Sequence, residues 1–193
     1  MVLAPFASID VAALRWVRTQ ERPAAYALRS EEKEIATLAW EKPEGSLATA
    51  RTSGATWTFK RAGFLQPTIL ARQPGSEEPV ARLTAHLSRH EITLGSGPSY
   101  RLRHVSHLVP AWSLTTDRGV EIAHLEPVAE GRSLQGGAAV VARPASDPTL
   151  PLLLTISWYF VVLTWFEDEA IDALAPYEGP DPPLARGRTA PGS

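Results

Sequence analysis

Arginine and lysine recur through the middle of the sequence, where several of them alternate with apolar residues. An alternating basic residue in a strand points away from the core. A guanidinium group holds phosphate oxygens through two parallel hydrogen bonds, so the pattern predicts an outer face that binds anionic head groups. An ordinary solvated sheet face is the alternative, and the spacing alone favours it. The basic residues are Arg51, Lys60, Arg61, Arg72, Arg82, Arg89, Arg101 and Arg103, and the candidate ligand-binding residues among them are Arg72, Arg82, Arg101 and Arg103.

The histidines are the second group that could do chemistry. His86 and His90 are four residues apart and could share a face of a continuous strand, whereas His104 and His107 are three apart and would not. A metal site needs three or four ligands with supporting partners, and no carboxylate spacing completes one here. These histidines, together with His124, are therefore expected on the surface or at the rim, and no metal ion is predicted.

Serine, histidine and aspartate, the residue types of a hydrolase active site, all occur in the sequence, but no hydrolase motif contains them. The sequence has no G-x-S-x-G elbow, and His90-Glu91 is not followed by the second histidine of H-E-x-x-H. Gly95-Ser96-Gly97 lies between strands and is expected to be a turn, not a dinucleotide-binding loop. We therefore expect a protein that is not an enzyme and has no cofactor. An enzyme of unrecognised type is the alternative, and it would need a deep polar pocket.

Composition narrows the class of protein further. The chain has 193 residues, a net charge of −2 and no cysteine, which suits one domain without disulfides or thiolate metal sites. The weak net charge, and the expectation that Trp57 and Phe59 face inward, argue against nucleic-acid binding. The segment Val2–Leu14 lacks a positive stretch before it and is expected to be a lead-in, not a signal peptide. These features predict a cytoplasmic protein that can lie peripherally at a membrane, and the scarcity of lysine beside arginine indicates a bacterial source.

Alternation with a period of two runs through most of the chain and predicts strands with one wet face. In Gly119–Leu125, for example, Val120 and Ile122 are expected on one face and Glu121 and Ala123 on the other. About twelve short strands at roughly ten-residue spacing favour an antiparallel barrel or sandwich. The expected strands are Leu14–Thr19, Tyr26–Ser30, Glu34–Trp40, Leu47–Thr52, Ala55–Lys60, Thr68–Arg72, Val80–Leu87, Glu91–Leu94, Tyr100–His104, Ala111–Thr115, Gly119–Leu125 and Ala138–Arg143.

Glycine and proline mark the expected turns between these strands, and Gly136-Gly137 is one of them. After the last strand, Leu150–Phe166 is expected to form a helix that is apolar on every side. Asp147 is expected to cap this helix, with Pro148 or Pro151 in its first turn. The acidic residues Glu167, Asp168, Glu169 and Asp172 are expected to be its solvated end.

A helix without a polar side has to be buried on all sides, in protein or in lipid. Trp158 and Tyr159 fall in the middle of the apolar run, whereas membrane helices carry such residues at the interfaces. The preceding strands could close into a barrel around the helix, and alanines in them would leave room for it (Ala36, Ala71, Ala81, Ala85, Ala123 and Ala139). The alternative is a single-span membrane anchor that carries a β domain.

The order of these elements resembles the tubby C-terminal-like superfamily, which includes the LURP-one-related proteins and the phospholipid scramblases. The residues that carry the resemblance are Trp57–Phe64, Thr68–Arg72, the turn at Gly75 and the helix Leu150–Phe166. The resemblance implies a closed antiparallel β-barrel of about twelve strands around a central hydrophobic C-terminal helix. It implies one domain over residues 1–175, with the helix at about 149–169. The proline-rich, apolar-poor composition of residues 176–193 predicts a disordered tail, which is a departure from the family pattern. It also implies a non-enzymatic binding or scaffold protein, with an anionic phospholipid or a protein as the partner.

Overall fold

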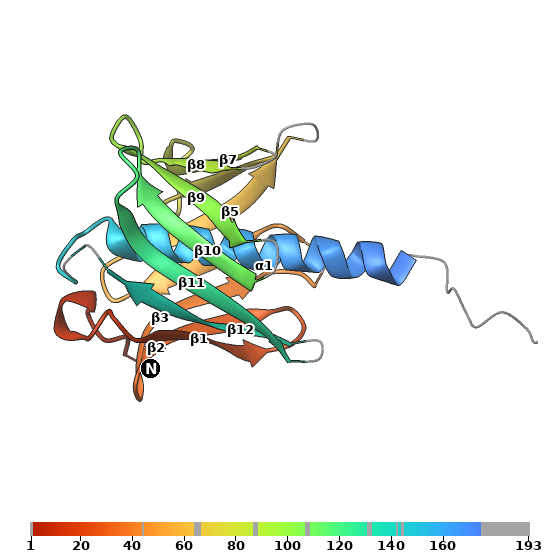
Figure 1. Cartoon of the computed structure of the whole chain (residues 1–193), viewed down its shortest axis with the longest axis horizontal. Coiled ribbons are helices and arrows are strands. Elements are labelled where there is room, and N and C mark those ends of the chain that lie inside the picture. The colour runs from red at the N-terminus through yellow and green to blue at the C-terminus, as the bar shows by residue number, and fades with distance from the viewer. Residues whose placement is uncertain are drawn as a thin grey trace, which may run out of the picture.

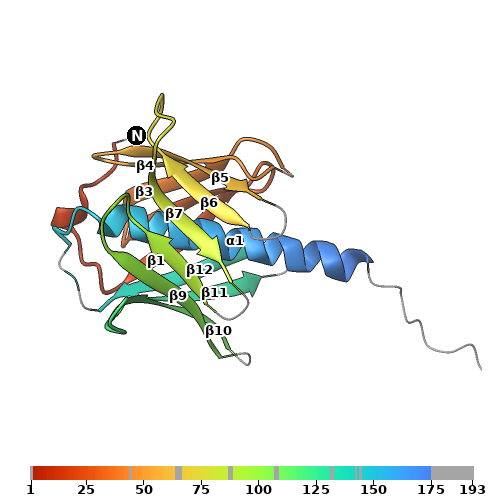
Figure 2. The same cartoon turned by 90° about the horizontal axis from the view of Figure 1, so that it is seen from above.

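The computed structural model describes residues 2–43, 45–63, 67–86, 89–106, 109–130, 133–141, 143 and 145–174. Within these residues, twelve antiparallel strands form one closed barrel, because β1 pairs with both β2 and β12. The helix α1 runs through the middle of this barrel and extends past the strands at its C-terminal end (Figure 1 and Figure 2). The predicted fold class, a closed barrel around a hydrophobic C-terminal helix, is confirmed.

Each strand pairs with its neighbour in sequence, so the chain goes up and down around the barrel. Every predicted strand overlaps an observed one, and Thr68–Arg72 has the predicted bounds, whereas the ends of the other strands differ. The proline-rich tail predicted at 176–193 lies outside the described residues. The elements are β1 (Leu14–Gln20), β2 (Ala25–Ser30), β3 (Lys33–Trp40), β4 (Ala48–Thr52), β5 (Thr56–Ala62), β6 (Thr68–Arg72), β7 (Pro79–Ala85), β8 (His90–Thr93), β9 (Ser99–Ser106), β10 (Val109–Thr116), β11 (Glu121–Glu130), β12 (Ser133–Val140) and α1 (Leu150–Leu174), after a short 3₁₀ helix at Phe6–Ser8.

The apolar residues of the alternating patterns in β5 and β9 line the interior. Trp57 and Phe59 of β5 are buried, as the sequence predicts, and so are Tyr100 and Leu102 of β9. Buried alanines in the strands leave space for the helix, as expected for Ala36, Ala71, Ala81 and Ala123. The expectation for Ala139 is wrong, because this residue faces outward on β12 beside His124 of β11.

The alternation expected for Gly119–Leu125 is also wrong. Leu114 of β10 pairs with Ala123, but the next residue, Thr115, pairs with Glu121. The extra residue, Ile122, marks a β-bulge, which breaks the period of two. Ile122 and Ala123 are therefore both buried, while Val120 lies 55% exposed before the strand.

The helix α1 forms the centre of the core. All of its residues from Leu152 to Val162 are buried, whichever side of the helix they are on. Trp158 stacks on Trp16 of β1 with ring centroids 5.6 Å apart, and Tyr159 stacks on Trp40 of β3 at 5.3 Å. Burial of each such large side chain contributes about 1.5–3 kcal/mol, so the barrel and the helix depend on each other for stability.

The observed helix is longer than the predicted one. It continues past the acidic residues to Leu174, the last residue that the structure describes. Glutamate and alanine are good helix formers, so the end of the apolar run was a poor guide to the end of the helix. Within the described part of the chain, no helix is long and apolar enough to cross a membrane.

The two adjacent glycines predicted as a turn lie inside β12, and that prediction is wrong. Gly136 pairs with Trp16 of β1 and with Pro127 of β11, and Gly137 pairs with Arg15 and Glu126. A Cβ atom on Gly136 would lie 2.7 Å from the Trp158 ring and 2.6 Å from the Glu126 carbonyl oxygen. Position 136 therefore requires glycine, because the central helix approaches the backbone of the sheet here. Glycine is commonly found in strands at such close approaches.

A polar cluster holds the segment before α1 against the barrel. Asp147 accepts hydrogen bonds from the Thr149 backbone N–H (2.8 Å) and hydroxyl (2.7 Å). It also pairs with Arg143, whose guanidinium donates to the Tyr100 hydroxyl of β9 at 3.3 Å. The predicted cap is thus corrected: Asp147 orders the turn before the helix, and its side chain bonds to Thr149 and not to the first turn of α1.

Replacing Asp147 by asparagine should lower the free energy of unfolding by about 1–2 kcal/mol at neutral pH. Burial alone would raise the pKa of Asp147, but the bonds from Thr149 and Arg143 outweigh it and hold the pKa below its ordinary value. A lowered native pKa stabilises the fold above the ordinary carboxyl pKa of about 4, and this contribution disappears as the pH falls through the native value. Urea unfolding followed by tryptophan fluorescence at several pH values would measure it. A gap between wild type and Asp147→Asn that does not shrink on acidification would contradict the assignment.

Candidate functional site

The outer face of β4, β5, β6 and β7 carries positive charge without any negative charge. No aspartate or glutamate occurs in these four adjacent strands. Their outward side chains are four cations and a set of threonines and aliphatic residues. We call this surface the cationic face, and its charged residues are Arg51, Lys60, Arg72 and Arg82.

The strand register brings three of these cations around one leucine. Lys60 of β5 pairs with Leu70 of β6, and Leu70 pairs with Arg82 of β7. Neighbouring strands are about 4.8 Å apart, so Lys60 and Arg82 flank Leu70 within about 10 Å of each other. Arg72 lies two residues further along β6 on the same side, and its buried Nε has no hydrogen-bond partner in the described part of the chain.

The structure separates Arg101 and Arg103 from the other two candidate arginines. Both are exposed on β9, beyond the intervening strand β8. Glu91 of β8 pairs directly with Arg101, and Thr93 of β8 pairs with Arg82. The four candidate residues therefore form two pairs, Arg72 with Arg82 and Arg101 with Arg103, and a carboxylate stands between the two pairs.

Two of the other basic residues lie elsewhere. Arg61 pairs with the buried Ile69, so it sits on the inner-facing side of β5, where the helix leaves the barrel. Its charge favours ionisation of Tyr159, but burial of that phenol is the larger effect and raises the pKa of Tyr159. Arg89 is exposed in the connection between β7 and β8. The expectation that the basic residues face outward is thus wrong for Arg61.

Two histidines, on the inward-facing side of β8 and β9, lie against aromatic rings. The His90 ring is 4.4 Å from the Phe160 ring of α1, and burial, with a smaller effect from the charge of His86, lowers the pKa of His90 to about 4. His104 contacts Trp112 at 5.0 Å. His107 lies outside the described residues. In the part of the chain that is described, no three side chains of histidine, aspartate or glutamate are placed to hold a metal ion.

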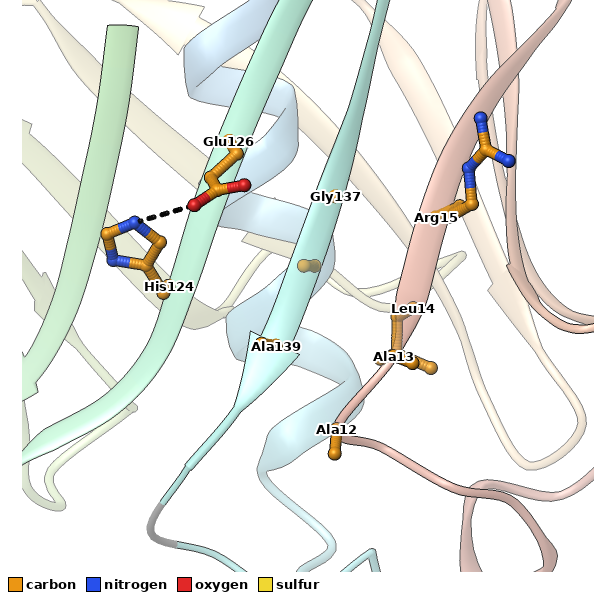
Figure 3. A pocket seen from close by; sticks show the side chains of 9 residues that line it. Ala12, Ala13, Leu14, Arg15, His124, Glu126, Gly137 and Ala139 are labelled. Atoms are coloured by element: carbon orange, nitrogen blue, oxygen red, sulfur yellow. Dashed lines mark ion pairs between the residues drawn. The ribbon is translucent and has the colours of Figure 1, made fainter. Parts of the chain in front are cut away.

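A groove of about 300 Å³ that the sequence did not predict lies over β12, between β1 and β11. Its floor consists of Gly137 and Ala139 of β12, with Ala12 and Ala13 from the segment before β1. Figure 3 shows Arg15 of β1 and Glu126 of β11 on opposite sides of Gly137. The pair of glycines was the feature of the sequence that could have indicated this groove. Only the strand register shows that they lie inside β12 and not in a turn.

His124 connects the carboxylates beside this groove. Its Nε2 lies 3.4 Å from Glu126 Oε1, and its Nδ1 lies 3.4 Å from Glu121 Oε1. The buried hydroxyl of Ser113 donates to Glu121 at 2.6 Å. Because Ser113 donates to a carboxylate and not to the imidazole, the arrangement does not activate the serine as a nucleophile.

Comparison of the chain with protein-family models, with curated proteins and with solved structures finds no match.

Proposed function

We propose that this protein is a non-enzymatic, tubby-like barrel whose cationic face binds anionic phospholipid at a membrane surface. The observation that carries the proposal is the outer face of four adjacent strands with four cations and no carboxylate. The closed barrel with its hydrophobic C-terminal helix supports the kinship with the tubby-like superfamily.

The chemistry of the cationic face suits phosphate groups held in a surface. Arg72 and Arg82 can each offer a planar fork of donors to phosphate oxygens, and the threonines beside them add hydroxyl donors. Each basic residue close to an anionic membrane contributes about 1 kcal/mol. The four cations together would therefore contribute about 4 kcal/mol, which is enough for reversible binding and not for permanent anchoring.

Removal of two cations from the face should weaken this binding strongly. We expect the protein to sediment with vesicles of phosphatidylcholine and phosphatidylserine but not with phosphatidylcholine alone. The variant Lys60→Gln with Arg82→Gln should lower the partition coefficient about 30-fold, from about 1 kcal/mol for each lost charge. Added salt should weaken binding of the wild type, since the contacts are solvent-exposed.

Two further variants serve as controls. Lys33→Gln with Arg118→Gln removes two exposed cations that lie outside the cationic face and should change binding little. Arg101→Gln with Arg103→Gln should have a smaller effect than the first variant, because Glu91 offsets Arg101. Equal binding to both kinds of vesicle, or an equal loss in the Lys33 and Arg118 control, would rule out the proposal. If the cationic face instead binds a protein, that protein would replace anionic phospholipid as the proposed ligand.

A further inference from the structure

We propose that the groove over β12 binds a small zwitterion, with its carboxylate at Arg15 and its ammonium at Glu126. The groove lies six strands away from β6 around the closed barrel. It is therefore on the opposite side from the cationic face, and the two surfaces can be tested separately.

The floor of the groove is kept open by a glycine that the fold does not require. Gly136 needs to be glycine because Trp158 and the Glu126 carbonyl crowd it, whereas a Cβ on Gly137 would meet nothing within 4 Å. Glycine weakens a strand because it costs backbone entropy and packs no side chain. Gly137 thus lowers strand stability without relieving any contact, and its visible effect is the open space between the two walls.

The walls of the groove carry opposite charges in one row of the sheet. Arg15 pairs with Gly137, and Gly137 pairs with Glu126, so the two charged residues flank the glycine. Two strand spacings place their Cα atoms about 10 Å apart. Arg15 is exposed and makes no hydrogen bond or ion pair within the part of the chain that is described. His124, 3.4 Å from Glu126, holds the carboxylate on the other wall.

These features select the chemistry of the occupant. A guanidinium on one wall favours a carboxylate, and a carboxylate on the other favours an ammonium group. The alanines and the glycine between them offer only aliphatic surface to the body of the ligand. A groove of about 300 Å³ is at the small end of ligand sites, so the occupant is a short molecule with opposite charges at its two ends.

Three probes of similar length test the assignment. They are 6-aminohexanoate, hexanoate and hexylamine, which carry both charges, only the carboxylate and only the ammonium. We expect ligand-observed NMR to show that 6-aminohexanoate binds at least about tenfold more tightly than either of the others, because each lacks one charge-assisted hydrogen bond. If hexanoate binds as tightly as 6-aminohexanoate, only Arg15 contributes to binding and the proposal is overturned. The proposal is also overturned if none of the three probes binds.

Four variants, three single substitutions and one double exchange, tie the binding to the groove. Gly137→Val places its Cβ where nothing lies within 4 Å and puts a branched side chain on the floor of the groove. It should therefore abolish binding of 6-aminohexanoate, while the midpoint of thermal unfolding is kept or raised because valine favours strands. Arg15→Glu and Glu126→Arg should each weaken binding about tenfold or more. The double exchange should restore it, because the zwitterion can lie in the reverse direction. Undiminished binding by Gly137→Val, or no recovery in a folded double exchange, would overturn the proposal. None of these variants should change sedimentation with anionic vesicles, because the groove and the cationic face lie on opposite sides of the barrel.

Discussion

Gly136→Ala is expected to destabilise the protein by about 2–3 kcal/mol, although alanine is the smallest possible change. The added Cβ would lie 2.6 Å from the Glu126 carbonyl oxygen and 2.7 Å from Cη2 of Trp158. The first contact is with backbone, and the second is with a ring that is wedged between α1 and β1, so neither neighbour can move cheaply. Thermal unfolding followed by circular dichroism should show a midpoint lower by roughly 5–10 °C for a domain of this size.

The neighbouring glycine supplies a matched control for this prediction. Gly137→Ala introduces the same atom on the other face of the same strand, where nothing lies within 4 Å. It should leave the stability unchanged or raise it by about 0.5–1 kcal/mol, because alanine restricts the unfolded chain. Combining Gly136→Ala with Trp158→Phe removes Cη2, so the two changes should cost less together than the sum of their separate effects. Equal effects of alanine at 136 and 137 would contradict the close approach of the helix.

Trp158→Ala is expected to lower the free energy of unfolding by about 3–5 kcal/mol. Trp158 is fully buried, stacks on Trp16 with ring planes only 2° apart, and meets the edge of Tyr26 at 6.0 Å. Removal of the ring leaves a cavity between the helix and three strands that the closed barrel cannot collapse to fill. Urea unfolding monitored by far-UV circular dichroism would measure the loss, and it would not depend on the fluorescence of the deleted residue.

Trp165→Ala is the comparison for this prediction. Trp165 lies further along the same helix, close to where α1 leaves the barrel, and is only partly buried. Trp165→Ala should lower the free energy of unfolding clearly less than Trp158→Ala does, because Trp165 is already partly in contact with water. A similar cost at both positions would mean that the helix is not held by the middle of the barrel.

The cationic face and the groove over β12 are proposed to bind different ligands. The cationic face carries four cations and no carboxylate, while the groove over β12 is lined by both Arg15 and Glu126. Because they lie on opposite sides of the barrel, a protein bound to a membrane through β4 to β7 would keep the groove open to water. Measurement of 6-aminohexanoate binding in the presence of anionic vesicles would show whether the two sites are occupied together.

Local patterns in the sequence determined most of the elements. Strands such as Thr68–Arg72 and the start of α1 at Leu150 were predictable, because alternation and an unbroken apolar run report directly on which residues need burial. The need to enclose a helix without a polar side then required a closed sheet. These inferences rest on free energies that each residue carries wherever it is placed, mainly the transfer of apolar surface out of water.

Tertiary structure decided the features that depend on what lies opposite a residue. The bulge at Ile122, the strand placement of Gly136 and Gly137, and the inward position of Arg61 all follow from register and from the approach of α1. The same holds for the site: the sequence identified Arg72 and Arg82 as cations of one surface, but only pairing with β8 set Glu91 beside Arg101. Glycine looks the same in a sequence whether it serves a turn, a tight contact or an open groove. The difference lies in which atoms occupy the space its missing side chain would fill, and that is known only when distant strands are side by side.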